Sequence, residues 1–270
     1  MSNDLSNAED GNERYTVPAL ERGLLLLCEF SRDRRTLSAP DLARRLQLPR
    51  STVFRLLSTL ETMGFVEKAE GGRDYRLGVA VLRLGFEYLA SLELTDLGRP
   101  ILERLCQDIH LPCNLVIRDQ RSIVYIAKIS PPTPFASSVT VGTRLPAHAT
   151  VLGHILLGEL SLEALRELYP EEGLEAFTDR TPRNAEQLFD ACRAIREQGY
   201  AMSEGFFEAG ISTVAAPVLD HAGRVVAALG STVMAPKFDA DRLQGMVARV
   251  KEAASELSTL LRYSRQASDG

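Results

Sequence analysis

Two short segments with helical apolar periodicity, separated by a very short link, constrain this chain more than any other feature. In the first, LSAPDLARRLQL, Ser38 and Asp41 form a capping signal and Pro40 lies in the first helical turn. In the second, LPRSTVFRLLSTLETMG, Pro49 suits the first helical position and Gly64 suits a C-terminal stop. Two short helices joined by a tight turn form a helix-turn-helix.

The flanking segments complete a compact N-terminal domain over residues 15–77. FVEKA and RDYRL are alternating segments around the turn 70–72, which predicts a β-hairpin, or wing. A helix should precede the helix-turn-helix, because apolar residues recur there every three or four positions. The residues expected on its buried face are Val17, Leu20, Gly23 or Leu24, and Leu27. These elements predict a winged helix-turn-helix.

The rest of the chain predicts three further regions. Residues 1–14 are polar and should form a disordered tail, whereas residues 78–93 should form a linker helix. This helix is too apolar to be exposed, so we expect it to pack on a partner subunit. Residues 94–265 alternate hairpin strands with helices, which favours an α+β domain with an antiparallel sheet flanked by helices. Among its elements we expect a strand at 137–141 and a helix capped by Thr181.

Charge is distributed unevenly along the 270 residues. The net charge is −5, yet residues 15–85 contain 12 Lys and Arg against 8 Asp and Glu. A basic first quarter attached to an acidic remainder suggests a nucleic-acid-binding module fused to another domain. The four cysteines lack metal-ligand spacing, so we expect buried thiols, no metal site and no cofactor. No apolar run is long enough to span a membrane and no signal peptide is evident, which predicts a cytoplasmic protein.

The second helix of a helix-turn-helix lies in the major groove, and its first residues reach the base edges. Arg50, Ser51, Thr52 and Arg55 lie on these turns, and arginine can donate two hydrogen bonds to guanine. Phe54 is expected at the rim of the contact, with a place at the edge of the core as the alternative. The wing residues expected to contact phosphates are Lys68, Arg73 and Arg76. A winged helix that only packs or dimerises remains the alternative for the whole module.

The sequence resembles the IclR family of bacterial transcriptional regulators. The matching blocks are ALERGLLLLCEF, LSAPDLARRLQLPRSTVFRLLSTLETMGFVEK, YRLGVAVLRLG, RLPAHATVLGHILL, QGYAMSEGFFEAGISTVAAPV and VVAALGSTV. The resemblance implies an N-terminal winged helix, a dimerising linker helix and a C-terminal GAF-like domain that binds a small, usually anionic effector. It also implies homodimers, often dimers of dimers, on palindromic double-stranded operator DNA.

The resemblance also implies an effector pocket between a loop-helix segment and three strands. Its residues here are Ala147, His148, Ala149, Thr150, Gly153, Ser203, Thr213, Gly230 and Thr232. The family's founding repressor, which senses keto acids, has Asp, Cys and Ser at the positions of Ser203, Thr213 and Gly230. This difference favours a roomier, less negative pocket, and hence a carboxylate with an aromatic or hydrophobic body. A small keto acid is the alternative effector.

The residues themselves suggest how a carboxylate would bind. The amides near Ala149 and Thr150 open a helix and attract anions, and Arg144 and His148 could complete a carboxylate clamp. The alternatives are a surface salt bridge for Arg144 and a loop histidine for His148. His154, which stands where lysine is usual in the family, is expected on the helix surface.

Two other classes of function compete with a DNA-binding regulator. An enzyme would use the C-terminal domain, but the chain has no nucleophile elbow, no metalloprotease motif and no phosphate-binding or dinucleotide-binding glycine loop. An interaction module that acts without DNA would not explain the basic first quarter. The sequence therefore favours a non-enzymatic regulator.

Overall fold

The computed structural model describes residues 16–31, 33–90, 93–132, 139–205, 207–208, 210–233 and 240–268. The predicted tail, residues 1–14, lies outside these ranges. The chain divides into two compact units, Met1–Leu89 and Ala90–Gly270.

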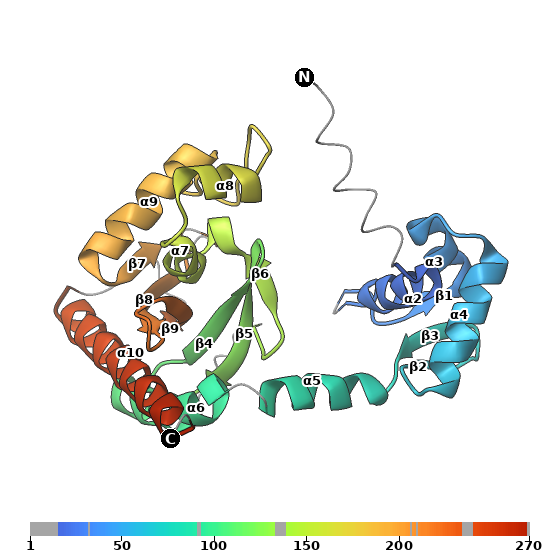
Figure 1. Ribbon diagram of the computed structural model, residues 1–270, viewed down its shortest axis with the longest axis horizontal. Helices are drawn as coiled ribbons and strands as arrows, with labels where there is room; N and C mark the ends of the chain where they lie inside the picture. Colours follow the sequence, from blue (N-terminus) through green and yellow to red (C-terminus); the bar gives the residue numbers. More distant parts are fainter. Residues whose placement is uncertain are drawn as a thin grey trace. The chain divides into compact units, whose positions relative to one another are not determined.

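The first unit combines helices with a small antiparallel sheet (Figure 1). Its elements are α2 (Pro18–Cys28), β1 (Leu37–Ser38), α3 (Ala39–Leu46), α4 (Arg50–Thr62), β2 (Val66–Lys68), β3 (Asp74–Leu77) and α5 (Ala80–Ala90). The Ser38 hydroxyl caps α3 by accepting a hydrogen bond from the Asp41 amide, as the sequence predicted. Gln47 then adopts a left-handed conformation (φ 53°) and turns the chain, and Pro49 is the N-cap of α4.

The hydrophobic core of the first unit confirms the helix-turn-helix and the wing, but only part of the predicted face of α2. Leu27 packs against this core, and Gly23 lies close to Leu56 of α4, as predicted. Leu26 is fully buried with Val53 and Leu57 of α4, whereas Val17, Leu20 and Leu24 are each more than half exposed. The prediction was wrong for Val17, Leu20 and Leu24 because α2 is apolar on several sides, so periodicity alone did not fix which side is buried. The sheet also contains β1, which pairs with β3 and escaped prediction because it has only two residues.

The second unit is built around a six-stranded antiparallel sheet in the order β6-β5-β4-β9-β8-β7. Its strands are β4 (Cys113–Asp119), β5 (Ser122–Ile129), β6 (Arg144–Pro146), β7 (Ala201–Glu204), β8 (Ser212–Leu219) and β9 (Val225–Val233). Its helices are α6 (Glu93–Ile109), η1 (Ala147–Ala149), α7 (Val151–Leu157), α8 (Leu162–Leu168), α9 (Ala185–Gln198) and α10 (Ala240–Ser268).

Helices cover both faces of this sheet, which confirms the predicted α+β class (Figure 1). On one face α7 packs against the sheet, with α9 beside it, and the core there contains Val116 and Ala228. On the other face lie α6 and α10, where Gly98 of α6 approaches the side chains of Leu115 and Leu257. Alternate residues of each strand therefore face either α7 or the α6–α10 layer.

Two local predictions for the second unit and one for the cysteines of the whole chain need correction. Residues 139–141 form no strand, while residues 137–138 lie outside the described residues. The cap of α9 is Asn184, whose side chain accepts a hydrogen bond from the Gln187 amide, so the helix begins later than Thr181 suggested. Cys28 is exposed, whereas the other three cysteines are buried as predicted.

Within the described residues, no helix is both long and apolar enough to cross a membrane. The same part of the chain contains no group of three or more His, Cys, Asp or Glu side chains that could hold a metal ion.

Candidate nucleic-acid interface and effector site

The two sides of α4 differ sharply in burial. Val53 and Leu57 are fully buried in the core, which fixes the rotation of the helix. Arg50, Ser51 and Arg55 are exposed, and Thr52 is half-buried beside them. Phe54 is 63% exposed, which excludes the alternative place in the core. The leading end of α4 thus presents two guanidinium groups, a hydroxyl and an aromatic ring to solvent.

The basic residues of this unit differ in whether an acid already neutralises them. Arg44 pairs with Asp41 at 2.5 Å, and Arg76 pairs with Glu67 at 2.7 Å. Arg50 and Arg55, in contrast, make no side-chain hydrogen bond or ion pair with any residue that the structure describes. Their guanidinium donors are therefore available to an external anion or base edge.

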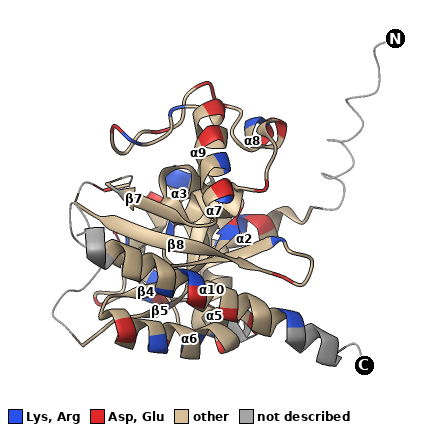
Figure 2. Cartoon of the chain, turned by 90° about the vertical axis from the view of Figure 1, so that its left-hand side faces the viewer, with Lys and Arg blue, Asp and Glu red and all other residues tan. Residues whose placement is uncertain are grey.

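The wing residues are placed for phosphate contacts, but two of the three already pair with acidic residues of the chain. Lys68 lies 3.6 Å from Glu61, Arg76 is paired as above, and Arg73 is exposed beyond the end of β2. A phosphate would have to compete with exposed carboxylates, which hold such partners weakly. Figure 2 shows the charges of both units, with basic residues on α3 and mixed charges along α9.

In the second unit, three predicted polar residues form one row across β7, β8 and β9. Ser203 pairs with Thr213, and Thr213 pairs with Thr232. The hydroxyls of Thr213 and Thr232 lie 3.2 Å apart, and Ser203 is buried. Gly230 belongs to the same face, opposite Ala215. Because Ala215 is part of the core beneath α7, this row lies on the α7 side of the sheet.

The loop-helix segment lies on the same side and is tightly packed. Ala147, His148 and Ala149 are buried, and the Thr150 hydroxyl accepts a hydrogen bond from the Gly153 amide at 3.2 Å. A Cβ on Gly153 would stand 2.1 Å from the Ala147 carbonyl oxygen. Gly153 therefore permits a close approach of two backbones, and its amide is occupied by the cap.

Arg144 and His148, the predicted carboxylate clamp, line one pocket, but each already has a partner within the chain. Arg144 is on β6, at the opposite edge of the sheet from Ser203 on β7, and it pairs with Asp119 at 2.7 Å. His148 Nε2 lies 2.9 Å from the Glu175 carbonyl oxygen. Both residues line a surface pocket of about 540 Å³ together with Arg121.

This surface pocket is bounded by groups that largely satisfy one another. Arg121 makes a bidentate ion pair with Glu171, at 2.7 and 2.6 Å, and its guanidinium lies 4.5 Å from the centre of the Tyr169 ring. Burial raises the pKa of Tyr169 to about 12. The pocket is therefore built from an internal ion pair rather than from unpaired cations.

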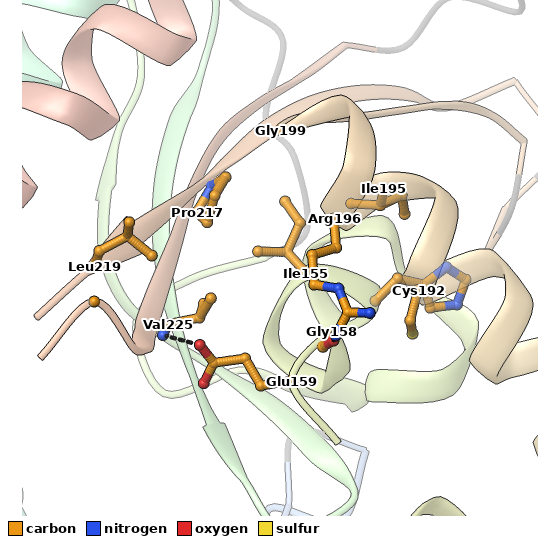
Figure 3. Close-up of a pocket in the computed structure, with 12 residues that line it drawn as sticks. Ile155, Gly158, Glu159, Cys192, Ile195, Arg196, Gly199, Pro217, Leu219 and Val225 are labelled. Carbon is orange, nitrogen blue, oxygen red and sulfur yellow. Dashed lines mark hydrogen bonds between the residues drawn. The ribbon is translucent and has the colours of Figure 1, made fainter. Parts of the chain in front are cut away.

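A second cavity, of about 360 Å³, lies at the other end of α7, between α7, α9 and the β8–β9 hairpin (Figure 3). Ile155, Ile195 and Leu219 give it an apolar lining. Its polar groups bind the chain itself, since Glu159 accepts a hydrogen bond from the Val225 amide and Arg196 donates one to the Gly158 carbonyl. Polar recognition of a ligand is therefore weaker here than at the polar row.

His154, which also lines this cavity, corrects the prediction that it lies on the helix surface. Its side chain is fully buried, and its Nε2–H donates a hydrogen bond of 2.7 Å to the His148 carbonyl. Burial lowers its pKa to about 4. The prediction was wrong because α7 lies between the sheet and α9, so every side of this short helix is covered.

Comparison with known proteins decides the family. The family described as "Bacterial transcriptional regulator IclR C-terminal" matches residues 86–259, and the IclR helix-turn-helix domain matches residues 19–70. The chain belongs to the IclR family. Its α4 is therefore the second helix of a DNA-binding helix-turn-helix, and its second unit is an IclR C-terminal domain.

Individual IclR relatives cover most of the chain. The Pca regulon regulatory protein of Pseudomonas putida is 32% identical over 240 residues, which are 88% of this chain and 82% of that protein. The transcriptional regulator XynR of Escherichia coli is 32% identical over 250 residues, covering 92% and 98%. A solved IclR homologue from Microbacterium hydrocarbonoxydans, complexed with 4-hydroxybenzoate, has 26% identity and a TM-score of 0.78, covering 91% and 99%.

Sequence reasoning missed several residues that belong to the candidate effector region. Asn114, the polar residue of CNLVIR, is buried on the α7 side of β4, and its place in an otherwise apolar strand was the available signal. The rings of His148, Phe177 and Phe207 follow one another at centroid distances of 6.1 and 4.8 Å. Phe177 and Phe207 lie in irregular segments, where no periodicity marks them.

Proposed function

We propose that this IclR-family chain is a ligand-responsive regulator that binds palindromic operator DNA as a homodimer. The N-terminal end of α4 enters the major groove, with Arg50 and Arg55 on base edges and Ser51 and Thr52 on bases or phosphates. Phe54 contacts the rim, while Lys68, Arg73 and Arg76 hold flanking phosphates. Such a role places the protein in the cytoplasm with the bacterial DNA.

The single observation that carries this proposal is the contrast within α4. Its leucine and valine side chains are buried, whereas Arg50 and Arg55 are exposed and make no ion pair with any residue in the described ranges. Arg44 and Arg76 of the same unit, by comparison, are already paired with Asp41 and Glu67. The unneutralised pair is therefore suited to DNA.

Exposed apolar faces in the first unit support the homodimer. Leu20 and Leu24 of α2 and Val79 and Leu82 near the start of α5 are between 55% and 78% exposed. Exposed large apolar side chains that lie together on a surface commonly mark interaction sites. A second copy of the chain is the partner that suits them, because a palindromic operator needs two recognition helices related by twofold symmetry.

We propose a small carboxylate with an aromatic body as the effector, bound between the polar row of Ser203, Thr213 and Thr232 and the segment Ala147–Gly153. The rings of Phe177 and Phe207, which follow the ring of His148 in that segment, offer aromatic contacts on its side of the site. The IclR homologue complexed with 4-hydroxybenzoate and the Pca regulon relative support an aromatic class. A small keto acid is the alternative within the same site.

Effector binding would change the affinity for DNA through α5. This helix ends at the boundary between the two compact units in the sequence. An effector that prefers one geometry of the two recognition helices shifts the population towards that geometry. A coupling of about 1–3 kcal/mol, or roughly 5- to 150-fold in operator affinity, is ordinary for such regulators.

The test combines two binding measurements on the full chain. Electrophoretic mobility shifts with fragments of the host's own upstream DNA should select a fragment that contains an inverted repeat. Calorimetric titration with matched aromatic and keto acids should show tighter binding of the aromatic class, and the acid that binds should change the mobility shift. Binding of keto acids alone would reverse the effector class, and absence of any selected fragment would refute the DNA-binding role.

A further inference from the structure

The strongest unexplained feature of the second unit is the buried side-chain amide of Asn114. The residue is 4% exposed, and its Oδ1 accepts no hydrogen bond from any residue that the structure describes. Burying a polar group without a partner is costly, and leucine or valine would avoid that cost at this position of an apolar strand. A buried acceptor without a donor in the chain needs an explanation, and a hydrogen-bond donor on a bound molecule would supply one.

The strand register shows which side of the sheet this amide faces. Asn114 pairs with Gly230, and Val116 pairs with Ala228, without a bulge between them. Val116 and Ala228 belong to the core beneath α7, so Asn114 faces α7 as well. It therefore shares its face with Thr232, which lies two residues beyond Gly230 on the neighbouring strand.

Gly230 leaves the space beside the amide free of a side chain. A Cβ at Gly230 would meet the Val214 carbonyl oxygen at 2.7 Å and the Ala215 Cβ at 2.9 Å, so β8 and β9 need a glycine there. Gly230 lies directly opposite Asn114 on β9 and has no side chain. It therefore places nothing between Asn114 and the hydroxyls of Thr213 and Thr232.

On its other side Asn114 has a cation. Lys128 of β5 is directly opposite Asn114, so the two side chains lie on the same face. Lys128 is half-buried, and its Nζ donates a hydrogen bond of 2.6 Å to the Val139 carbonyl, which holds the ammonium near the sheet. From β5 to β7, the face thus carries an ammonium, an open amide and three hydroxyls.

We propose that Asn114 and Lys128 recognise a hydroxylated organic acid as the effector. In this complex, Asn114 Oδ1 accepts a hydrogen bond from a hydroxyl of the acid. The Lys128 ammonium balances the charge of the acid, because the neighbouring side chains of the row are neutral. This inference rests on the proposed binding of an organic acid in the second unit and adds that the acid must carry a donor hydroxyl. Neither residue was assigned to the site by sequence or family resemblance.

The first test uses pairs of acids that differ by one hydroxyl. Calorimetry with the full chain should show that 4-hydroxybenzoate binds at least about tenfold more tightly than benzoate. The Asn114→Leu variant, which removes the acceptor and keeps the number and branching of the side-chain heavy atoms, should bring this ratio close to one. Lys128→Met should weaken the binding of both acids of the pair by the same factor. A hydroxyl preference that persists in Asn114→Leu overturns the role of Asn114.

The second test needs no ligand. In the ligand-free chain, Asn114→Leu should keep or raise the Tm, because it replaces an unpaired buried amide by an apolar group. The matched control is Ser231→Ala, since Ser231 is buried on the other face of β9 and donates a 2.9 Å hydrogen bond to the Pro112 carbonyl. Ser231→Ala should lower the Tm and leave the hydroxyl preference intact. A Tm of Asn114→Leu lowered as in this control overturns the proposal, because the amide would then be structural.

A second pair of acids, 3-hydroxybutyrate and butyrate, separates this inference from the proposed function. If only this aliphatic pair binds, the aromatic effector class is refuted, and the ratio within the pair still decides the role of Asn114. If no acid binds the wild-type chain, organic-acid sensing and the hydroxyl-reading role are both refuted, whatever the Tm of Asn114→Leu.

Discussion

The buried histidine of α7 makes a quantitative prediction about pH. His154 has a folded-state pKa of about 4 because it is fully buried, against an ordinary value of 6.5. Between these values the unfolded chain binds more protons than the folded chain, so stability falls as the pH falls. From pH 7 to pH 5 the contribution of this one group amounts to about 2 kcal/mol.

The perturbation that isolates this term is His154→Gln, which removes the titrating ring. The substitution also costs packing and the hydrogen bond to the His148 carbonyl, so a single stability value would be ambiguous. The informative quantity is the change in unfolding free energy between pH 7 and pH 5. In the variant this change should be smaller than in the wild type by about 2 kcal/mol.

Urea denaturation followed by far-ultraviolet circular dichroism at the two pH values measures this difference, provided that the transition of the second unit is analysed. The packing cost cancels, because it is the same at both pH values. Equal pH dependence in the two proteins would refute the reasoning, since His154 would then titrate in the folded chain much as it does in the unfolded chain.

Other substitutions test the packing and the assembly. Gly153→Ala should lower the unfolding free energy by about 1–3 kcal/mol in thermal denaturation, because its Cβ would meet the Ala147 carbonyl oxygen; an unchanged Tm would contradict the close approach. Ser38→Ala should cost about 1 kcal/mol in urea denaturation through loss of the α3 cap, and a neutral result would show that the cap is dispensable. Leu82→Glu should convert dimers, or dimers of dimers, to smaller species in analytical ultracentrifugation; an unchanged sedimentation profile would exclude α5 from the interface.

The sequence predicted best where local chemistry and tertiary packing agree. Ser38, Asp41 and the leucines of α3 and α4 determine the helix-turn-helix by capping and periodicity, and the core confirms both. α2 was harder, because four consecutive leucines supply apolar residues to more than one side of the helix. Only contact with α4 shows that Leu26 is the buried one.

The effector region depended on contacts that are distant in sequence. Family resemblance indicated Ser203, Thr213 and Thr232, and the register of β7, β8 and β9 brings them together. The position of Arg144 at the far sheet edge and the burial of His154 follow from strand order and helix packing, which periodicity does not encode. The role proposed for Asn114 depends on its neighbours on β9 and β5, which the sequence does not reveal.

The central claim is that the exposed arginines of α4 read DNA, and operator affinity of single variants tests it most directly. An operator fragment is first selected by the wild-type chain, and its affinity is then measured for Arg55→Ala and Arg50→Ala. Arg44→Ala serves as the control, because Arg44 is exposed but already paired with Asp41 on α3. The account predicts a loss of about 1–3 kcal/mol and relaxed sequence preference for the α4 variants, with little change for the control. Wild-type affinity and footprint in both α4 variants would contradict it.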